Sequence, residues 1–316
     1  MSQHAQLIGL DWGTSSLRAY LYDVDGKVIA TRQHAWGIRQ LPEGGFAAAL
    51  RAITAGWPPC VIVAAGMIGS RQGWREVPYL DLPADAAAIA QGMLRVEACT
   101  SHALWIAPGL RRKEPADVMR GEETQIVGAL TQQRADRTAC FVLPGTHSKW
   151  ATVNDGRIVA FDTVMTGELY ALLMKHSILG AGIDLASAPS FSEEAFARGV
   201  HAVKDSGASG VFGCLFSVRA LMLAGQLAAD DLPDFVSGLL IGEEFRIAAL
   251  REVQATPLCL IGEPALCRRY IAAAAIFGHA PPAVIDDAAA QGLWQLAAAG
   301  GLLQHATFHS YAGADT

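Results

Sequence analysis

The chain has 316 residues, of which 52% are hydrophobic and 17% are charged, and its formal net charge is −6. An acidic chain without a basic block does not suit nucleic acid or an anionic membrane as its main partner, so a small-molecule ligand is expected instead. The length and the apolar content predict a buried core divided between two domains.

The cysteines and the apolar stretches indicate a cytoplasmic protein. No cysteine pair has the C-x-x-C spacing of a zinc or redox site, which predicts reduced thiols. No basic segment followed by an apolar core opens the chain, so no signal peptide is expected. The most apolar stretch, residues 207–229, carries Arg219 and is predicted to be a buried amphipathic helix rather than a membrane span. The cysteines are Cys60, Cys99, Cys140, Cys214, Cys259 and Cys267.

In chain order, three short strands open the first half, and an Asp-Gly turn at 25–26 separates the second from the third. A continuous apolar strand then runs into a glycine-rich loop at 66–74, as expected for the middle of a covered sheet. The predicted strands are 7–11, 17–23, 28–34, 60–65 and 103–107, and the predicted helices are 42–56 and 115–133.

The second half repeats the opening and then becomes mainly helical. The tail from residue 305 shows no periodicity and is expected to be partly disordered. A closing helix at 287–303 is expected to complete the second lobe. The predicted strands are 138–143, 149–153, 158–165, 257–261 and 283–285, and the other helices are 166–177, 192–203, 211–229, 234–252 and 264–277.

An internal repeat divides the chain into two lobes. Gly-Thr-x-Ser occurs at 13–16 and again at 145–148, each time between two strands, and each copy is followed by an Asp-Gly turn. The sequence therefore predicts two similar α/β lobes. We expect a first lobe at 1–135, a second lobe at 136–304 and a tail at 305–316.

The two Gly-Thr turns are candidates for phosphate binding, because such turns expose backbone N–H groups and short hydroxyls. Two turns in a repeated unit predict a clamp for a polyphosphate. Asp11 precedes only the first turn, and this asymmetry favours a Mg²⁺ role through water over a turn-capping role. Lys149 and Arg18 follow the turns and either offset phosphate charge or act as solvated or lobe-bridging cations.

Two adjacent carboxylates, Glu122 and Glu123, follow an Arg-Gly pair near a predicted helix start. They either complement the helix dipole or supply a general base that accepts the proton of a substrate hydroxyl. Their position between the two phosphate turns favours the base. Gly262 opens a helix after a strand of the second lobe, where an adenosine would find room.

The Asp-x-Gly-Thr turn at 11–14 and its partner resemble the superfamily of sugar kinases, actin and heat-shock chaperones. This resemblance implies an α/β fold of two ribonuclease-H-like, actin-like lobes with ATP in the cleft between them. Glu122 and Glu123 occupy the place of the catalytic aspartate of hexokinases and resemble the Gly-x-Glu-Glu element of exopolyphosphatases. That alignment favours Glu123 as the base and Glu122 as the reserve.

Four segments resemble the 2-dehydro-3-deoxygalactonokinase family in particular, and the similarity spans nearly the whole chain. They are residues 65–79, 118–125, 143–150 and 165–170. The resemblance implies transfer of phosphate from ATP to the 6-hydroxyl of 2-keto-3-deoxygalactonate in D-galactonate breakdown. Such a substrate needs a partner for its carboxylate, for which Arg71 is the first candidate and Arg120 the second.

The candidate site residues fall into four groups. The nucleotide-binding candidates are Gly13, Thr14, Ser15, Ser16, Gly145, Thr146, His147, Ser148, Lys149 and Gly262. The sugar-acid candidates are Ser70, Arg71, Trp74, Tyr79 and Arg120. The catalytic candidates are Glu123 and Glu122, and the candidate ligand of Mg²⁺ is Asp11.

Two other functions use the same cleft. One is hydrolysis of polyphosphate or a nucleotide, which the missing Asp-x-Gly before the second turn argues against, because exopolyphosphatases keep an acidic residue there. The other is a non-catalytic sensor or filament protein switched by ATP. The oligomeric state stays open.

Overall fold

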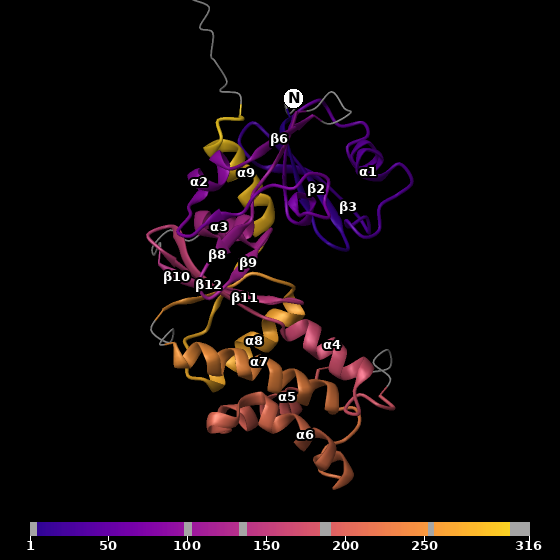
Figure 1. Ribbon diagram of the computed structural model, residues 1–316, viewed down its shortest axis with the longest axis vertical. Coiled ribbons are helices and arrows are strands. Elements are labelled where there is room, and N and C mark those ends of the chain that lie inside the picture. Colours follow the sequence, from indigo (N-terminus) through magenta and orange to yellow (C-terminus); the bar gives the residue numbers. More distant parts are fainter. Residues whose placement is uncertain (1–4, 98–102, 133–137, 184–190, 252–255, 304–316) are drawn as a thin grey trace, which may run out of the picture.

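Two β-sheets, one in each half of the chain, organise the protein (Figure 1). The computed structural model describes residues 5–97, 103–132, 138–183, 191–251 and 256–303. The expectations for Cys99, for the lobe border at 135/136 and for the tail from 305 lie outside these residues.

The first sheet has six strands in the order β3-β2-β1-β4-β7-β6. Its first three strands form an antiparallel meander, and β4 and β7 then continue the sheet parallel to β1. The strands are β1 (Ala5–Trp12), β2 (Leu17–Asp23), β3 (Val28–His34), β4 (Val61–Ala65), β6 (Leu94–Glu97) and β7 (Ala103–Ile106).

The second sheet repeats this plan in the order β12-β11-β10-β13-β14, with the same parallel and antiparallel senses. The predicted duplication is therefore confirmed for five strands of each sheet, whereas β6 of the first sheet has no counterpart in the second. Each Gly-Thr turn lies between the first two strands of its sheet. The strands are β10 (Ala139–Leu143), β11 (Ser148–Asn154), β12 (Arg157–Val164), β13 (Leu258–Leu260) and β14 (Ala283–Val284).

Apolar side chains on both faces of each sheet form the core, and helices cover these faces. In the first half these are α1 (Gly45–Ile53), the 3-10 turn η1 (Met67–Gly69), α2 (Ala86–Gln91) and α3 (Glu122–Gln132). In the second half they are α4 (Thr166–His176), α5 (Glu193–Lys204), η2 (Gly207–Ser209), α6 (Gly210–Leu223), α7 (Leu232–Leu250) and α8 (Pro264–Ile276).

The last helix, α9 (Ala288–Ala299), belongs by packing to the first sheet, although we expected it to complete the second lobe. It lies beside α2 and α3 (Figure 1), and its Ala290 carbonyl accepts a hydrogen bond from the Tyr22 hydroxyl at 2.7 Å. Gly128 and Gly292 let α3 and α9 approach closely, because a Cβ at Gly128 would stand 2.0 Å from the Ala288 carbonyl oxygen. The helical period identified the helix but not the lobe that receives it.

The helix predicted over 115–133 begins only at Glu122, and this is a second correction. Gly121 has a φ of +108°, a conformation outside any helix, and ends the strand before it. That strand, β9 (Asp117–Met119), joins β8 (Leu110–Arg112) and β5 (Leu80–Asp81) in a small sheet that the sequence did not reveal. This sheet contacts β12 and so connects the two halves.

The apolar stretch around α6 is less buried than expected. Phe212 and Phe216 are 79% and 68% exposed, so the prediction of a buried helix is wrong on this face. No single helix of the described residues is long and apolar enough to cross a membrane, and α5 with the segment from η2 to α6 meets that test only as a pair bent by 102°.

Candidate functional site

The first Gly-Thr turn joins β1 to β2 and is held mainly through its carbonyl groups. The N–H of Gly13 donates to the carbonyl of Ser16 at 2.9 Å, and the carbonyls of Gly13 and Thr14 accept hydrogen bonds from the backbone N–H groups of residues 38 and 39. Within the described residues, the N–H groups of Thr14 and Ser15 donate to no protein acceptor. Donors left free in this way suit an anionic oxygen.

The second Gly-Thr turn joins β10 to β11 and lies against the first turn of α4. The N–H of Glu168 donates to the carbonyl of Thr146 at 3.0 Å, and the Glu168 carboxylate lies 2.5 Å from Nε2 of His147. The N–H of Gly145 donates to Oγ of Ser148 at 3.3 Å, and a Cβ on Gly145 would meet open space. Thr146 and His147 are exposed, and their N–H groups donate to no acceptor among the described residues.

Asp11 stands one residue from the end of β1, directly before the first turn. Its carboxylate is half-buried and accepts no hydrogen bond from a described residue. Burial raises the pKa of Asp11, and the nearby Arg18 guanidinium partly lowers it. No cluster of three or more His, Cys, Asp or Glu side chains able to hold a metal occurs among the described residues, so a cation here would rely on one protein carboxylate and on other oxygen ligands.

The two adjacent glutamates at the start of α3 have different environments. Glu122 is half-buried, and its carboxylate accepts the N–H of Arg120 at 2.9 Å. Glu123 is fully buried and accepts the N–H of Gly121 at 2.7 Å and the hydroxyl of Thr124 at 3.0 Å. The alignment favoured Glu123 as the base, but a substrate hydroxyl can reach only an exposed carboxylate, and this favours Glu122.

Charge and burial act on both carboxyls. Burial and the neighbouring Glu122 raise the pKa of Glu123 to about 7. Burial also raises the pKa of Glu122, whereas Lys149 and His147 lower it. Lys149 and His147 both belong to the second turn and its strand, so the electrostatic influence on Glu122 comes from the second half of the chain.

Lys149 connects the two halves. It is 5% exposed, and its Nζ donates to the carbonyl of Val118 at 3.0 Å and to the hydroxyl of Thr163 at 2.7 Å. Of the two roles considered for this lysine, these contacts match the lobe-bridging cation. Arg18 is exposed beside the first turn and contacts the hydroxyl of Tyr20 at 3.4 Å.

The two arginines considered as partners of a substrate carboxylate differ in burial. Arg71 is exposed after η1, whereas Arg120 is 8% exposed and lies 4.2 Å from the ring centre of Tyr79. Nη2 of Arg120 donates to the Val77 carbonyl at 2.8 Å, but its Nε and Nη1 have no partner among the described residues, and neither has the buried Oγ of Ser70. A buried guanidinium without a carboxylate partner is costly unless a ligand supplies one.

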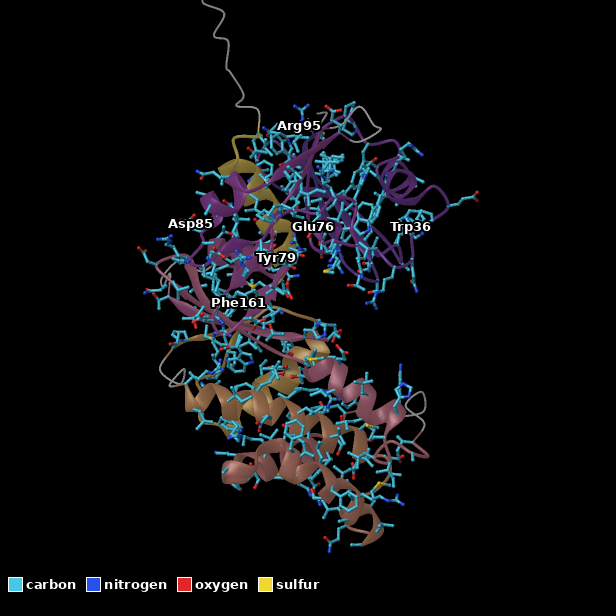
Figure 2. The ribbon with its side chains drawn as sticks, in the orientation of Figure 1. Trp36, Glu76, Tyr79, Asp85, Arg95 and Phe161 are labelled. Atoms are coloured by element: carbon cyan, nitrogen blue, oxygen red, sulfur yellow. The ribbon has the colours of Figure 1, made fainter. Side chains whose placement is uncertain are left out.

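The other two sugar-acid candidates, Trp74 and Tyr79, lie in different parts of the first half. Trp74 packs against Trp12 and Phe46, which makes it part of the core under the first turn. Tyr79 lies low in the first half, above Phe161 of the second half (Figure 2).

A cavity of about 160 Å³ opens beside the second turn. Gly145, the start of α4, and side chains of α7 and α8 line it. Gly262 lies nearby, because a Cβ there would be 3.4 Å from Pro144. The apolar lining residues are Tyr170, Leu240, Ile241, Leu266 and Tyr270.

The sequence analysis missed Glu244 of α7. This carboxylate is 1% exposed and accepts hydrogen bonds from Trp150 at 2.7 Å, from Tyr270 at 2.6 Å and from Thr166. Burial raises the pKa of Glu244, and these hydrogen bonds partly lower it. The signal in the sequence was an acidic pair inside a mostly apolar helix.

Comparison with known proteins gives one consistent family. The family model described as 2-keto-3-deoxy-galactonokinase matches residues 11–296. The 2-dehydro-3-deoxygalactonokinase of Escherichia coli is 36% identical over 293 residues, which cover 91% of this chain and 95% of that protein.

Solved structures agree on the fold. A protein from Sinorhizobium meliloti that carries the provisional name 2-dehydro-3-deoxygalactonokinase is 35% identical and superimposes with a TM-score of 0.85 over 93% of this chain and 98% of its own. Component A of (R)-2-hydroxyglutaryl-CoA dehydratase from Acidaminococcus fermentans reaches a TM-score of 0.50 at 11% identity over 93% of this chain and 98% of its own, a likeness of fold alone. The architecture is the expected α/β fold of two actin-like lobes.

Proposed function

Because the chain belongs to the 2-keto-3-deoxy-galactonokinase family, we propose that its cleft transfers the γ-phosphoryl group of ATP to the 6-hydroxyl of 2-dehydro-3-deoxy-D-galactonate, in D-galactonate catabolism. The observation that carries this proposal is the pair of equivalent Gly-Thr turns, one on each sheet, with Glu122 under the electrostatic influence of the second turn.

In this scheme the turns hold the phosphates of ATP. The free N–H groups at 14–15 and those at 146–147 donate to phosphate oxygens, because such donors stabilise charge without reorganisation. Asp11 would hold Mg²⁺ through water, since its half-buried carboxylate has no hydrogen-bond donor of its own in the described residues. The bound ion would neutralise charge on the phosphates.

Glu122 accepts the proton of the 6-hydroxyl as that oxygen bonds to the γ-phosphorus. The bond between this phosphorus and the ADP oxygen breaks, so the products are the sugar-acid 6-phosphate and ADP, and the proton remains on Glu122. The fully buried Glu123 fixes the start of α3 through the N–H of Gly121. Closure of the lobes excludes water from this step.

The free Nε and Nη1 of Arg120 are the donors that we assign to the carboxylate of the sugar acid. The hydroxyl of Ser70 would join them, and Tyr79 holds the guanidinium from one side. The cavity beside Gly145 and α8 would receive the adenosine. Because the substrate ATP is made in the cytoplasm and Cys140, Cys214 and Cys267 are free thiols, we place the reaction there.

The test is an ADP-release assay with MgATP and a set of sugar acids, followed by identification of the phosphorylated product by ³¹P NMR. We expect ADP release only when a 2-keto-3-deoxy sugar acid is present, and a phosphate monoester at its 6-position. ADP release that does not depend on the sugar acid would replace the kinase with a hydrolase. Tight ATP binding without any turnover would indicate a sensor.

A further inference from the structure

The two Gly-Thr turns are closed by different groups. In the first turn the N–H of Gly13 donates to a backbone carbonyl, that of Ser16, at 2.9 Å. In the second turn the N–H of Gly145 donates to a side chain, Oγ of Ser148, at 3.3 Å. The second turn therefore depends on whatever orients the Ser148 hydroxyl.

That hydroxyl begins a buried chain of hydrogen bonds. Oγ of Ser148 lies 2.9 Å from the hydroxyl of Tyr270, and this hydroxyl donates to Oε1 of Glu244 at 2.6 Å. The three side chains are at most 1% exposed. Water does not compete with these bonds, which strengthens each of them.

Glu244 also holds the other side of the turn. Its Oε1 accepts the hydroxyl of Thr166, the first residue of α4, and its Oε2 accepts Nε1 of Trp150 on β11. Thr166 lines the same cavity as Gly145. One carboxylate on α7 thus connects the turn, the strand that leaves it, the helix that supports it and α8.

The donor inventory gives the direction of this hydrogen-bond chain when Glu244 is ionised. Trp150 can only donate, and an ionised carboxylate can only accept, so in that state the hydroxyl hydrogens of Thr166 and Tyr270 both point to Glu244. Ser148 then donates to the oxygen of Tyr270 and turns a lone pair toward the N–H of Gly145. If Tyr270 instead donated to Ser148, that serine would turn its hydrogen to the carbonyl of Gly145, which lies 3.5 Å away.

We propose that Glu244 is a positioning residue of the nucleotide half-site, which acts through Tyr270 and Ser148 to hold the second Gly-Thr turn in its phosphate-binding shape. This inference rests on the proposed function. It makes the affinity for nucleotide, rather than that for the sugar acid, depend on a carboxylate that touches neither ligand.

The test removes one hydroxyl group from this chain of hydrogen bonds and keeps the aromatic ring that carries it. Tyr270→Phe breaks the link between Ser148 and Glu244. Tyr22→Phe is the matched control, because the Tyr22 hydroxyl is equally buried and donates to the Ala290 carbonyl at 2.7 Å, away from the second turn. Binding of MgADP is measured by calorimetry, KM for ATP and for the sugar acid by steady-state kinetics, and Tm by calorimetric melting.

We expect Tyr270→Phe to raise the Kd of MgADP and the KM for ATP about fivefold to tenfold and to change the KM for the sugar acid less than twofold. Tyr22→Phe should lower Tm to a similar degree and leave both KM values within about twofold of the wild type. Glu244→Gln should weaken MgADP binding as well, and the effects of Glu244→Gln and Tyr270→Phe should not add in the double variant.

Nucleotide affinity that is the same in Tyr270→Phe and Tyr22→Phe would overturn the positioning role, and so would full additivity with Glu244→Gln. If Glu244→Gln does not fold, the comparison of the two Tyr→Phe variants decides the question alone. A wild-type protein that binds no MgADP would contradict the proposed function itself, and this result is distinct from the other two.

Discussion

Asp117 on β9 accepts two hydrogen bonds from Thr163 on β12, one from its backbone N–H at 2.8 Å and one from its hydroxyl at 2.7 Å. The same hydroxyl accepts Nζ of Lys149. The small sheet between the lobes is therefore fastened to the second sheet by one carboxylate, one hydroxyl and one ammonium group. This is the packed connection about which we expect the lobes to hinge.

Thr163→Val keeps the shape of this connection and removes the hydroxyl. We expect a loss of about 1–3 kcal/mol in the free energy of unfolding, because the partly buried Asp117 and Lys149 each lose a partner. Urea unfolding measures this loss. Thr138→Val is the control, since the Thr138 hydroxyl contacts Asn154 in an exposed position, and we expect a change within about 0.5 kcal/mol there.

Glu122→Gln tests the proposed base. We expect turnover to fall about 10²–10⁴-fold, because the variant cannot accept the substrate proton, while the Kd of MgADP stays near that of the wild type. Steady-state kinetics and calorimetry measure the two quantities. Near-normal turnover in this variant, together with a large loss in Glu123→Gln, would return the role to the buried Glu123.

The raised pKa of Glu123 predicts that the free energy of unfolding depends on pH. Its folded pKa of about 7 lies above the ordinary value of 4.5, so its contribution to stability is fully present below pH 4.5 and is lost as the pH rises through 7. The size of this loss is about 3 kcal/mol. Glu123→Gln, which has no proton to lose, should lack this component of the profile, and chemical unfolding of both proteins between pH 4.5 and 8 measures the difference. Parallel profiles would contradict the assignment.

The two arginines offer a matched pair. Arg120→Met should raise the KM for the sugar acid at least about tenfold, since a charge-assisted hydrogen bond contributes 1.5–3 kcal/mol. Its Tm should change little, because the loss of the Val77 hydrogen bond and of the Tyr79 contact is offset by removal of a buried charge that has no carboxylate partner among the described residues. Arg71→Met should leave the KM within about twofold, as expected for an exposed side chain. The opposite ranking of the two KM values would favour Arg71.

Gly145→Ala tests the second turn directly. A Cβ at Gly145 would meet no protein atom within 4 Å, and its φ is not in the left-handed region, so Tm should not fall. The methyl group would stand in the space that we assign to phosphate, and the Kd of MgADP should rise about tenfold or more. Unchanged MgADP binding would remove Gly145 from the nucleotide site.

Several features of the site were evident in the sequence because they are local. The Gly-Thr turns, the carboxylate before the first turn and the Glu-Glu pair each occupy a short segment whose backbone chemistry does not depend on distant residues. The repeat of 13–16 at 145–148 also predicted two sheets of one plan, and their strand orders match over five strands, to which the first sheet adds β6.

Only the tertiary structure distinguished between two candidate residues of the same type. Glu122 and Glu123 are adjacent residues at the start of α3. Their difference in burial depends on what this helix packs against. The same holds for Arg71 and Arg120, whose surroundings come from segments around Val77 and Tyr79. The acidic pair at 243–244 did not reveal the role of Glu244, because the three donors to its carboxylate come from β11, α4 and α8.

The amino-acid sequence by itself thus determined the duplicated α/β plan and the segments that carry the chemistry, since hydrophobic period and turn composition are properties of neighbouring residues. Tertiary structure decided against which sheet α9 packs, which of the two carboxylates is fully buried and which buried groups lack a partner among the described residues. Burial and pairing depend on residues far apart in the chain, and a single sequence does not state which of them meet.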